Sequence, residues 1–167
     1  MPFTFYHLGP ALAFGLPLRK YLHLPTFIVA NVILDIEPLL VMMFGFNYPL
    51  HGYLHTALSA VGVGLLLGLV MFRLEGLMKD FYFKLQLENS SLRLKSFLVA
   101  GIFGAALHVL FDSLLYSEMN PLFPLLGNSL RSLNISSSSV YSSCVWLGVL
   151  GIAFYCVILV YSFVKKR

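Results

Sequence analysis

A histidine and an aspartate stand one helical turn apart in the middle of an apolar stretch, at His108 and Asp112 within residues 97–116. Residues at positions i and i+4 of a helix share one face, so the two side chains can act together. A carboxylate inside a membrane helix costs roughly 2.5 to 3.5 kcal/mol, so it persists where a partner, a cavity or a metal ion offsets that cost. An imidazole beside a carboxylate is a usual pair of ligands for a divalent metal. The pair therefore predicts a metal site.

Three further groups of polar residues in apolar surroundings could complete this site. His51 and His55 are also four positions apart, Asp35 and Glu37 precede a proline, and His7 lies in the first apolar segment. Residues two apart on a regular helix point to nearly opposite sides. Either the proline breaks the helix so that both acids reach one site, or one acid only supports a ligand.

An energy comparison favours a site with more than one metal ion. Three carboxylates in an apolar setting would cost about 8 to 10 kcal/mol, whereas structural zinc binding supplies about 10 to 16 kcal/mol. We therefore expect two or three divalent ions, with zinc as the expected metal. The candidate ligands are His7, Asp35, Glu37, His51, His55, His108 and Asp112.

The composition places these residues in a membrane. The chain has 167 residues, of which 59% are hydrophobic and 11% charged, and its mean hydropathy is +0.85. These values predict an all-α integral membrane protein with one transmembrane domain, residues 1–167. The net charge of +4 falls mostly in loops, where it indicates topology and contact with membrane lipids, so we expect no nucleic-acid partner.

Apolar runs divide the chain at residues 3–18, 26–46, 51–72, 97–116 and 144–164. The first is short for a span and the others are long enough, so we expect a bundle of about five helices, four full spans plus a short N-terminal helix. Residues 73–95 repeat apolar side chains at helical spacing and pair acids with bases four positions apart. This pattern predicts an interfacial amphipathic helix. A long loop at 117–142 joins the last two runs.

Basic residues indicate which side each connection faces. Five of them lie within 73–95 and three more end the chain, whereas the 117–142 loop contains only Arg131. The 73–95 connection and the C-terminus are then cytoplasmic, and the 117–142 loop is external. With a helical rise of about 1.5 Å per residue, His55 and Asp112 lie about 6 Å below the outer ends of their runs. We therefore expect the site in the outer half of the cell membrane, facing the outer leaflet.

The motifs of several hydrolase classes are absent, since the sequence has no HExxH, no GxSxG and no P-loop. Every arginine lies in a loop or near a terminus, so the metal itself would have to hold a substrate oxyanion. Asp35 or Glu37 would orient or deprotonate the attacking water.

The order of these motifs resembles that of a known family. The chain resembles the membrane-bound metal-dependent hydrolases of the LexA-regulated type. Four motifs carry the resemblance: the histidine of Phe5-Tyr-His7-Leu-Gly9-Pro10, the acids of Asp35-Ile-Glu37-Pro38, the histidines of residues 51–56 and the pair in His108-Val-Leu-Phe-Asp112. That family is distantly similar to zinc-dependent phospholipase C and S1/P1-type nucleases. The resemblance implies that His7, Asp35, His55, His108 and Asp112 are metal ligands, and that Glu37 and His51 are further ligands or proton-transfer groups.

We therefore expect a membrane-embedded, metal-dependent hydrolase of phosphate esters that acts on a lipid headgroup, as a phosphodiesterase resembling phospholipase C or as a phosphomonoesterase. Two alternatives use the same residues. The cluster could carry a metal ion or a proton across the membrane, or the metal could only hold the helices of a noncatalytic protein together.

Overall fold

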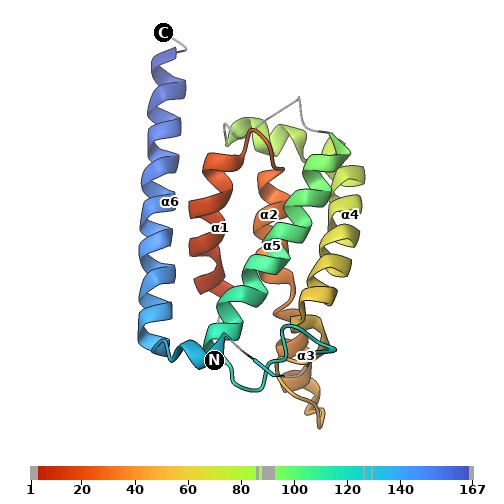
Figure 1. Cartoon of the computed structure of the whole chain (residues 1–167). Helices are drawn as coiled ribbons and strands as arrows, with labels where there is room; N and C mark the ends of the chain where they lie inside the picture. Colours follow the sequence, from red (N-terminus) through yellow and green to blue (C-terminus); the bar gives the residue numbers. More distant parts are fainter. Residues whose placement is uncertain (1–3, 86, 88–92, 126, 129, 166–167) are drawn as a thin grey trace.

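The computed structural model describes residues 4–85, 87, 93–125, 127–128 and 130–165, in which helices and loops occur and no strand is found. Figure 1 shows the helices arranged as a bundle. Their bounds are α1 Thr4–Leu18, α2 Leu24–Ile33, α3 Ile36–Phe44, α4 Ala57–Lys84, α5 Leu94–Leu115 and α6 Ser137–Lys165, with short 3-10 turns η1 Tyr53–His55 and η2 Arg131–Leu133.

Four segments are long and apolar enough to cross a membrane. They are Leu24–Phe44, which comprises α2 and α3, then Ala57–Met78, Leu94–Leu115 and Ser137–Lys165. The prediction of an all-helical chain with four such segments is confirmed. α1, with 15 residues, is shorter than these segments and contains two prolines.

The second apolar run is divided into two helices, α2 and α3. Pro38 has no N–H to donate to the carbonyl of Leu34, and its ring would clash with that carbonyl in a continuous helix. The chain instead makes a tight turn, in which Asp35 N–H donates to Val32 O and Glu37 N–H donates to Leu34 O. Asp35 therefore lies at a break in the helix, where its side chain can leave the α2 surface.

The predicted interfacial helix is the end of α4 and not a separate element. α4 runs unbroken to Lys84, and Figure 1 shows its last turns bending across the end of the bundle that carries the C-terminus. Residues 86 and 88–92 of the predicted 73–95 segment lie outside the described residues, and α5 begins at Leu94. His23 anchors this end of α4, because its ring lies 5.4 Å from that of Tyr82 and stacks on Phe97 at 3.9 Å.

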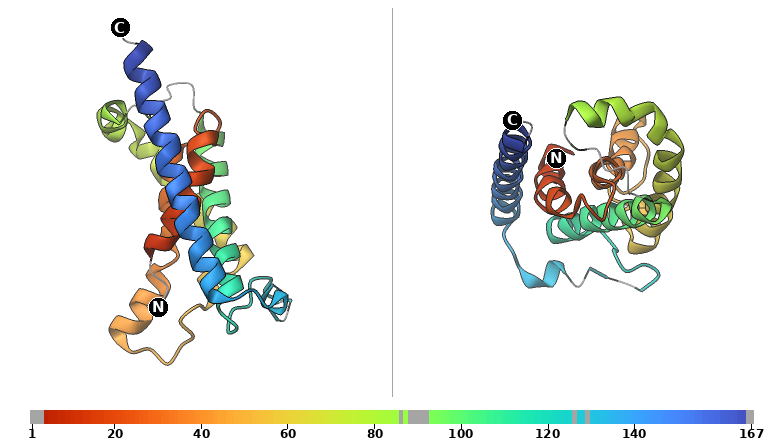
Figure 2. Two further views of the ribbon diagram at one scale, coloured as in Figure 1. Left: turned by 90° about the vertical axis from the view of Figure 1, so that its left-hand side faces the viewer. Right: turned by 90° about the horizontal axis from the view of Figure 1, so that it is seen from above.

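Glycines allow two pairs of helices to approach closely. Gly64 of α4 faces Gly101 of α5, and a Cβ added at Gly64 would lie 2.6 Å from the backbone of Gly101. On the other side of the bundle, Gly9 of α1 faces the backbone of Cys144 and Gly148 in α6. The view from above in Figure 2 shows α6 standing outside the bundle against α1. α1 is therefore enclosed between α6 and the remaining helices.

The predicted 117–142 loop is shorter than expected, because α6 begins at Ser137. Two side chains tie this loop to the end of α5. The Asn128 amide donates to Ser113 O and Tyr116 O at 2.8 and 2.9 Å. Arg131 donates to Leu114 O at 2.9 Å. These bonds satisfy carbonyls that the last turn of a helix leaves without an intrahelical donor.

Replacement of Gly64 by alanine should destabilise the α4–α5 contact. The added methyl group would press on the Gly101 backbone, and such overpacking typically costs roughly 1 to 3 kcal/mol. Gly62→Ala is the matched control, since a Cβ at Gly62 meets nothing within 4 Å. Thermal unfolding in detergent should show a lower midpoint for Gly64→Ala and an unchanged or slightly higher one for Gly62→Ala. Equal midpoints for the two variants would contradict the close contact.

Candidate metal centre

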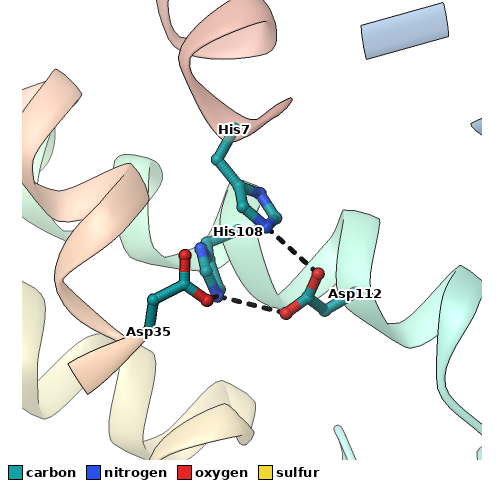
Figure 3. Close-up of side chains that lie close together, drawn as sticks. All are labelled: His7, Asp35, His108 and Asp112. Atoms are coloured by element: carbon teal, nitrogen blue, oxygen red, sulfur yellow. Dashed lines mark ion pairs between the residues drawn. The ribbon is translucent and has the colours of Figure 1, made fainter. Parts of the chain in front are cut away.

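Two overlapping groups of potential ligands lie at the end of the bundle opposite the C-terminus. The first group comprises His7, Asp35, His108 and Asp112, which Figure 3 shows pointing toward one another. The second comprises His51, His55 and Asp112, and within each group the ligand atoms lie within 4.8 Å of one another. These side chains are all buried. Six of the seven candidate ligands therefore come together, from α1, the α2–α3 turn, the residues before α4, and α5.

Asp112 belongs to both groups, and its two oxygens face different histidines. Its Oδ1 lies 3.1 Å from His7 Nε2. Its Oδ2 lies 3.3 Å from His108 Nε2, 3.7 Å from His55 Nε2 and 3.8 Å from His51 Nε2. Asp35 Oδ1 is 3.7 Å from His108 Nε2. Asp112 is therefore the residue that would contribute ligand atoms to both groups.

Three of the histidines are held at Nδ1 by an oxygen that can only accept a hydrogen bond. Nδ1 of His55 donates to Glu37 Oε2 at 2.7 Å, and Nδ1 of His108 donates to the backbone oxygen of Asn31 at 3.0 Å. Nδ1 of His51 donates to Glu118 Oε1 at 3.1 Å. In the neutral ring the proton is then on Nδ1, and Nε2 carries a lone pair. This arrangement is typical of metal-binding histidines, in which an outer oxygen fixes the tautomer and the ring orientation.

The lone pairs of two of these rings face each other. His55 Nε2 lies 3.2 Å from His108 Nε2. A hydrogen bond between them would require one ring to carry two protons, whereas a cation between them can accept both lone pairs. Both oxygens of Asp112 and Nε2 of His51 are buried without a hydrogen-bond partner among the described residues. Buried polar atoms of this kind are costly, and imidazole and carboxylate ligands suit zinc. The residues present therefore fit a metal centre.

Glu37 lies behind His55 and outside both ligand groups. Its Oε2 accepts from His55 Nδ1 and from Gly52 N–H at 3.0 Å. Its Oε1 accepts from the Tyr48 hydroxyl at 3.1 Å and from Leu54 N–H at 3.2 Å. The helix break turns Asp35 toward the centre and Glu37 toward the following loop. The helix is broken before Pro38, as the first alternative expects, and Glu37 supports the ring of a candidate ligand, His55, as the second expects.

The expectation that a helix begins at His51 is wrong. Residues 53–55 form η1, and α4 begins at Ala57 with Thr56 as its cap, whose hydroxyl accepts from Ser59 N–H at 3.1 Å. His51 and His55 therefore do not share a helix face. Their rings meet edge to face, with centroids 4.9 Å apart, because the Glu37 carboxylate holds the loop between them.

Sequence reasoning missed three groups beside the centre. Tyr116 stacks on His51 at 3.8 Å, and burial raises the pKa of its phenol, so the hydroxyl keeps its proton. Burial lowers the pKa of His51, although Asp112 and Glu118 oppose this effect. Glu118 is the only acid among residues 117–142, and that isolation was a usable signal. The Asn31 backbone carbonyl leaves no signal in the sequence.

His23 lies away from this centre, as its position in a connection between helices suggests. Its Nδ1 accepts from Thr26 N–H at 3.4 Å and so caps α2, and its Nε2 lies 3.0 Å from Glu75 Oε2.

A cavity of about 370 Å³ opens on the other side of His51, between residues 48–56 and 118–123. The centre thus has a hollow beside it at one end of the bundle.

Comparisons of the chain with protein-family models, with curated proteins and with solved structures find no match. What the centre does must therefore be inferred from its own geometry.

Asp112→Asn and His51→Ala should change the metal content by different amounts. Asp112 contributes to both ligand groups, so Asp112→Asn should lose both metal ions, whereas His51→Ala should lose only one. Elemental analysis of zinc-loaded, purified protein measures this directly. His23→Asn is the control, because asparagine also caps helices well and this position is remote from the centre. Equal metal content in all variants, or none in the wild type, would rule out the two overlapping groups.

Glu37→Gln should weaken metal binding without changing its stoichiometry. The glutamine oxygen can still accept from His55 Nδ1, but the negative charge that raises the basicity of the ring is lost. Changes of this kind typically cost about 10- to 100-fold in metal affinity, which competition with a chromophoric chelator would measure. If Glu37 were itself a ligand, the variant would bind fewer ions at saturation, as we expect for Asp35→Asn.

Proposed function

We propose that the chain is an integral membrane protein that binds two divalent metal ions, preferably zinc, and hydrolyses a phosphate ester of a lipid. The observation that carries this proposal is the pair of ligand groups that share Asp112. Paired metal sites with a bridging carboxylate suit the transfer of a phosphoryl group to water, because both the attacking and the leaving oxygen need stabilisation.

The distribution of apolar and basic residues supports insertion into the cell membrane. Four segments have the required length and hydropathy, and large apolar side chains such as Leu66, Phe103 and Val160 are exposed on their outer faces. Five basic residues lie within 73–95, and Figure 1 shows the end of α4 and the start of α5 at the same end of the bundle as the C-terminus. By the positive-inside rule this end is cytoplasmic, and the metal centre then faces the outer leaflet.

Bound metal ions would supply a nucleophilic water at neutral pH and would neutralise the phosphate oxygens. The remaining chemistry falls to the residues of the chain. His7, His51, His55 and His108 hold the centre rigidly, since their rings are buried and fixed by hydrogen bonds or stacking. Asp35 is the proposed base, because all four hydrogen bonds of Glu37 go to the loop and to His55. The water oxygen adds to phosphorus and its proton passes to Asp35. As the bond between phosphorus and the ester oxygen breaks, Asp35 returns that proton to the leaving oxygen.

Packing favours hydrolysis over transport. A transporter needs a second route from the centre to the cytoplasmic end, yet most of the side chains buried in that half of the bundle are apolar. The buried polar residues His23 and Thr26 there hydrogen-bond to each other. Ala11, Leu22, Phe27 and Ala100 form one buried cluster there, and Leu16, Leu24 and Ile158 form another. The cavity next to His51 also favours a substrate site over a metal that only holds helices together.

The motif order supports the same proposal. The order of the motifs resembles that of the membrane-bound metal-dependent hydrolases. The residues that this resemblance marks as ligands lie close together here: His7, Asp35, His55, His108 and Asp112. Convergence of residues from distant parts of the chain is what a shared chemical role requires.

Asp112→Asn should abolish hydrolysis while leaving the fold intact. Purified protein in lipid vesicles would be assayed against phosphodiester and phosphomonoester lipids, with and without a chelator. We expect wild-type activity to disappear with the chelator and return with zinc, and Asp112→Asn to be slower by about 100-fold or more. His23→Asn should keep the wild-type rate. If metal-loaded wild type cleaves no ester but carries zinc into vesicles, and His55→Ala stops that flux, the protein is a transporter.

A further inference from the structure

The cavity beside His51 has walls of a particular chemistry. Three aromatic rings contribute to it, those of Tyr48, Tyr53 and Phe123, together with the carboxylate of Glu118. The centroids of Tyr48 and Tyr53 lie 6.1 Å apart, and those of Tyr53 and Phe123 lie 5.6 Å apart with the rings nearly perpendicular. The electron-rich faces of such rings attract cations.

The charge in this cavity is negative. No lysine or arginine is among the residues that line it. The Glu118 side chain is 43% exposed and accepts from His51 Nδ1 with Oε1, so the carboxylate contacts the histidine and still borders the open space. Arg131, the one basic residue of the 117–142 loop, donates to the backbone oxygens of Leu114 and Ile135. An anionic group in the cavity would therefore meet a carboxylate with no cationic side chain to offset it.

The imidazole ring of His51 lies between this cavity and the candidate metal centre. His51 lines the cavity, and its Nε2 is directed at Asp112 Oδ2, 3.8 Å away. Tyr116 stacks on the same ring and holds it in this orientation. If a phosphate ester binds at the centre, a second group that a short linker joins to the phosphate would therefore reach the aromatic walls of the cavity.

We propose that this cavity is a subsite for an ammonium group, primary or quaternary, that a short linker joins to the phosphate of the substrate. The inference rests on the proposed function and adds the class of headgroup. The ammonium group lies over the aromatic faces and beside the Glu118 carboxylate, while the phosphate lies at the metal centre. A lipid headgroup and a water-soluble ester can both contain a phosphate and an ammonium group joined by a short linker, and the experiment below distinguishes them.

Hydrolysis of a headgroup series tests the subsite. Lipids with identical acyl chains and phosphocholine, phosphoethanolamine or phosphoglycerol headgroups would be compared, with glycerophosphocholine and glycerophosphoglycerol as the soluble arm. We expect kcat/KM to be higher for the ammonium-bearing esters by about tenfold or more. Preference in the lipid arm alone identifies a lipid substrate, and equal preference in both arms identifies a headgroup that is recognised without its acyl chains.

Two variants separate recognition from metal binding. Glu118→Gln removes the charge but keeps an oxygen that can accept from His51 Nδ1. As for Glu37→Gln, the metal affinity should fall but the metal content at saturating zinc should stay at the wild-type level. At saturating zinc, the headgroup preference should fall to about threefold or less. Phe123→Leu removes one ring and should lower the preference in the same direction. Phe103→Leu is the matched control, since Phe103 is exposed on the outer face of α5. An unchanged preference in Glu118→Gln would overturn the proposal.

Direct binding gives a readout that does not depend on catalysis. Saturation-transfer NMR with tetramethylammonium should detect contact with the wild type and a loss of the signal in Glu118→Gln and Phe123→Leu. If the wild type cleaves no ester at all, the proposed function fails, and the tetramethylammonium signal still decides whether the subsite exists. Absence of that signal in the wild type would overturn the subsite even if esters are cleaved.

Discussion

Three imidazole rings of the candidate metal centre are each held by an oxygen at Nδ1. An oxygen that can only accept a hydrogen bond lies at Nδ1 of His51, His55 and His108, so in the neutral rings the Nε2 lone pairs face inward. Lone pairs that face one another across 3.2 Å repel unless a positive charge lies between them. The cost of burying Asp112 without a hydrogen bond points to the same charge. Much of the surrounding structure serves to hold these rings in place.

The ligands come mostly from places where helices begin, end or break. Pro38 interrupts the second apolar segment and releases Asp35 from the helix surface, while Glu37 holds the loop that carries His55. Regular helices could not bring these groups together, because side chains on a continuous helix are fixed by its periodicity. α5 is the exception, and there the four-residue spacing of His108 and Asp112 is enough.

This difference explains which features could be predicted from the sequence. Apolar runs of membrane-spanning length indicate helices with little ambiguity, and a pair on one helix face can be read from spacing alone, as for His108 and Asp112. Loop geometry cannot be read in that way. His51 and His55 were grouped through a helix that does not form there. Glu37 was expected among the ligands, whereas its carboxylate accepts hydrogen bonds from His55 and from the loop. The backbone oxygen of Asn31 depends on the packing of α2 against α5, which a linear pattern does not encode.

The close contact between α1 and α6 links the two ends of the polypeptide. α1 carries His7, and its outer side is covered by α6 through Gly9 and Gly148. Translation produces α1 first and α6 last, so α1 must wait for nearly the whole chain to leave the ribosome before its final neighbour arrives. His7 is therefore synthesised before His51, His55 and His108 but is the last of these four to be fixed in place. The candidate centre can therefore be completed only after α6 has been made, and a chain lacking α6 would leave the outer side of α1, which carries His7, uncovered.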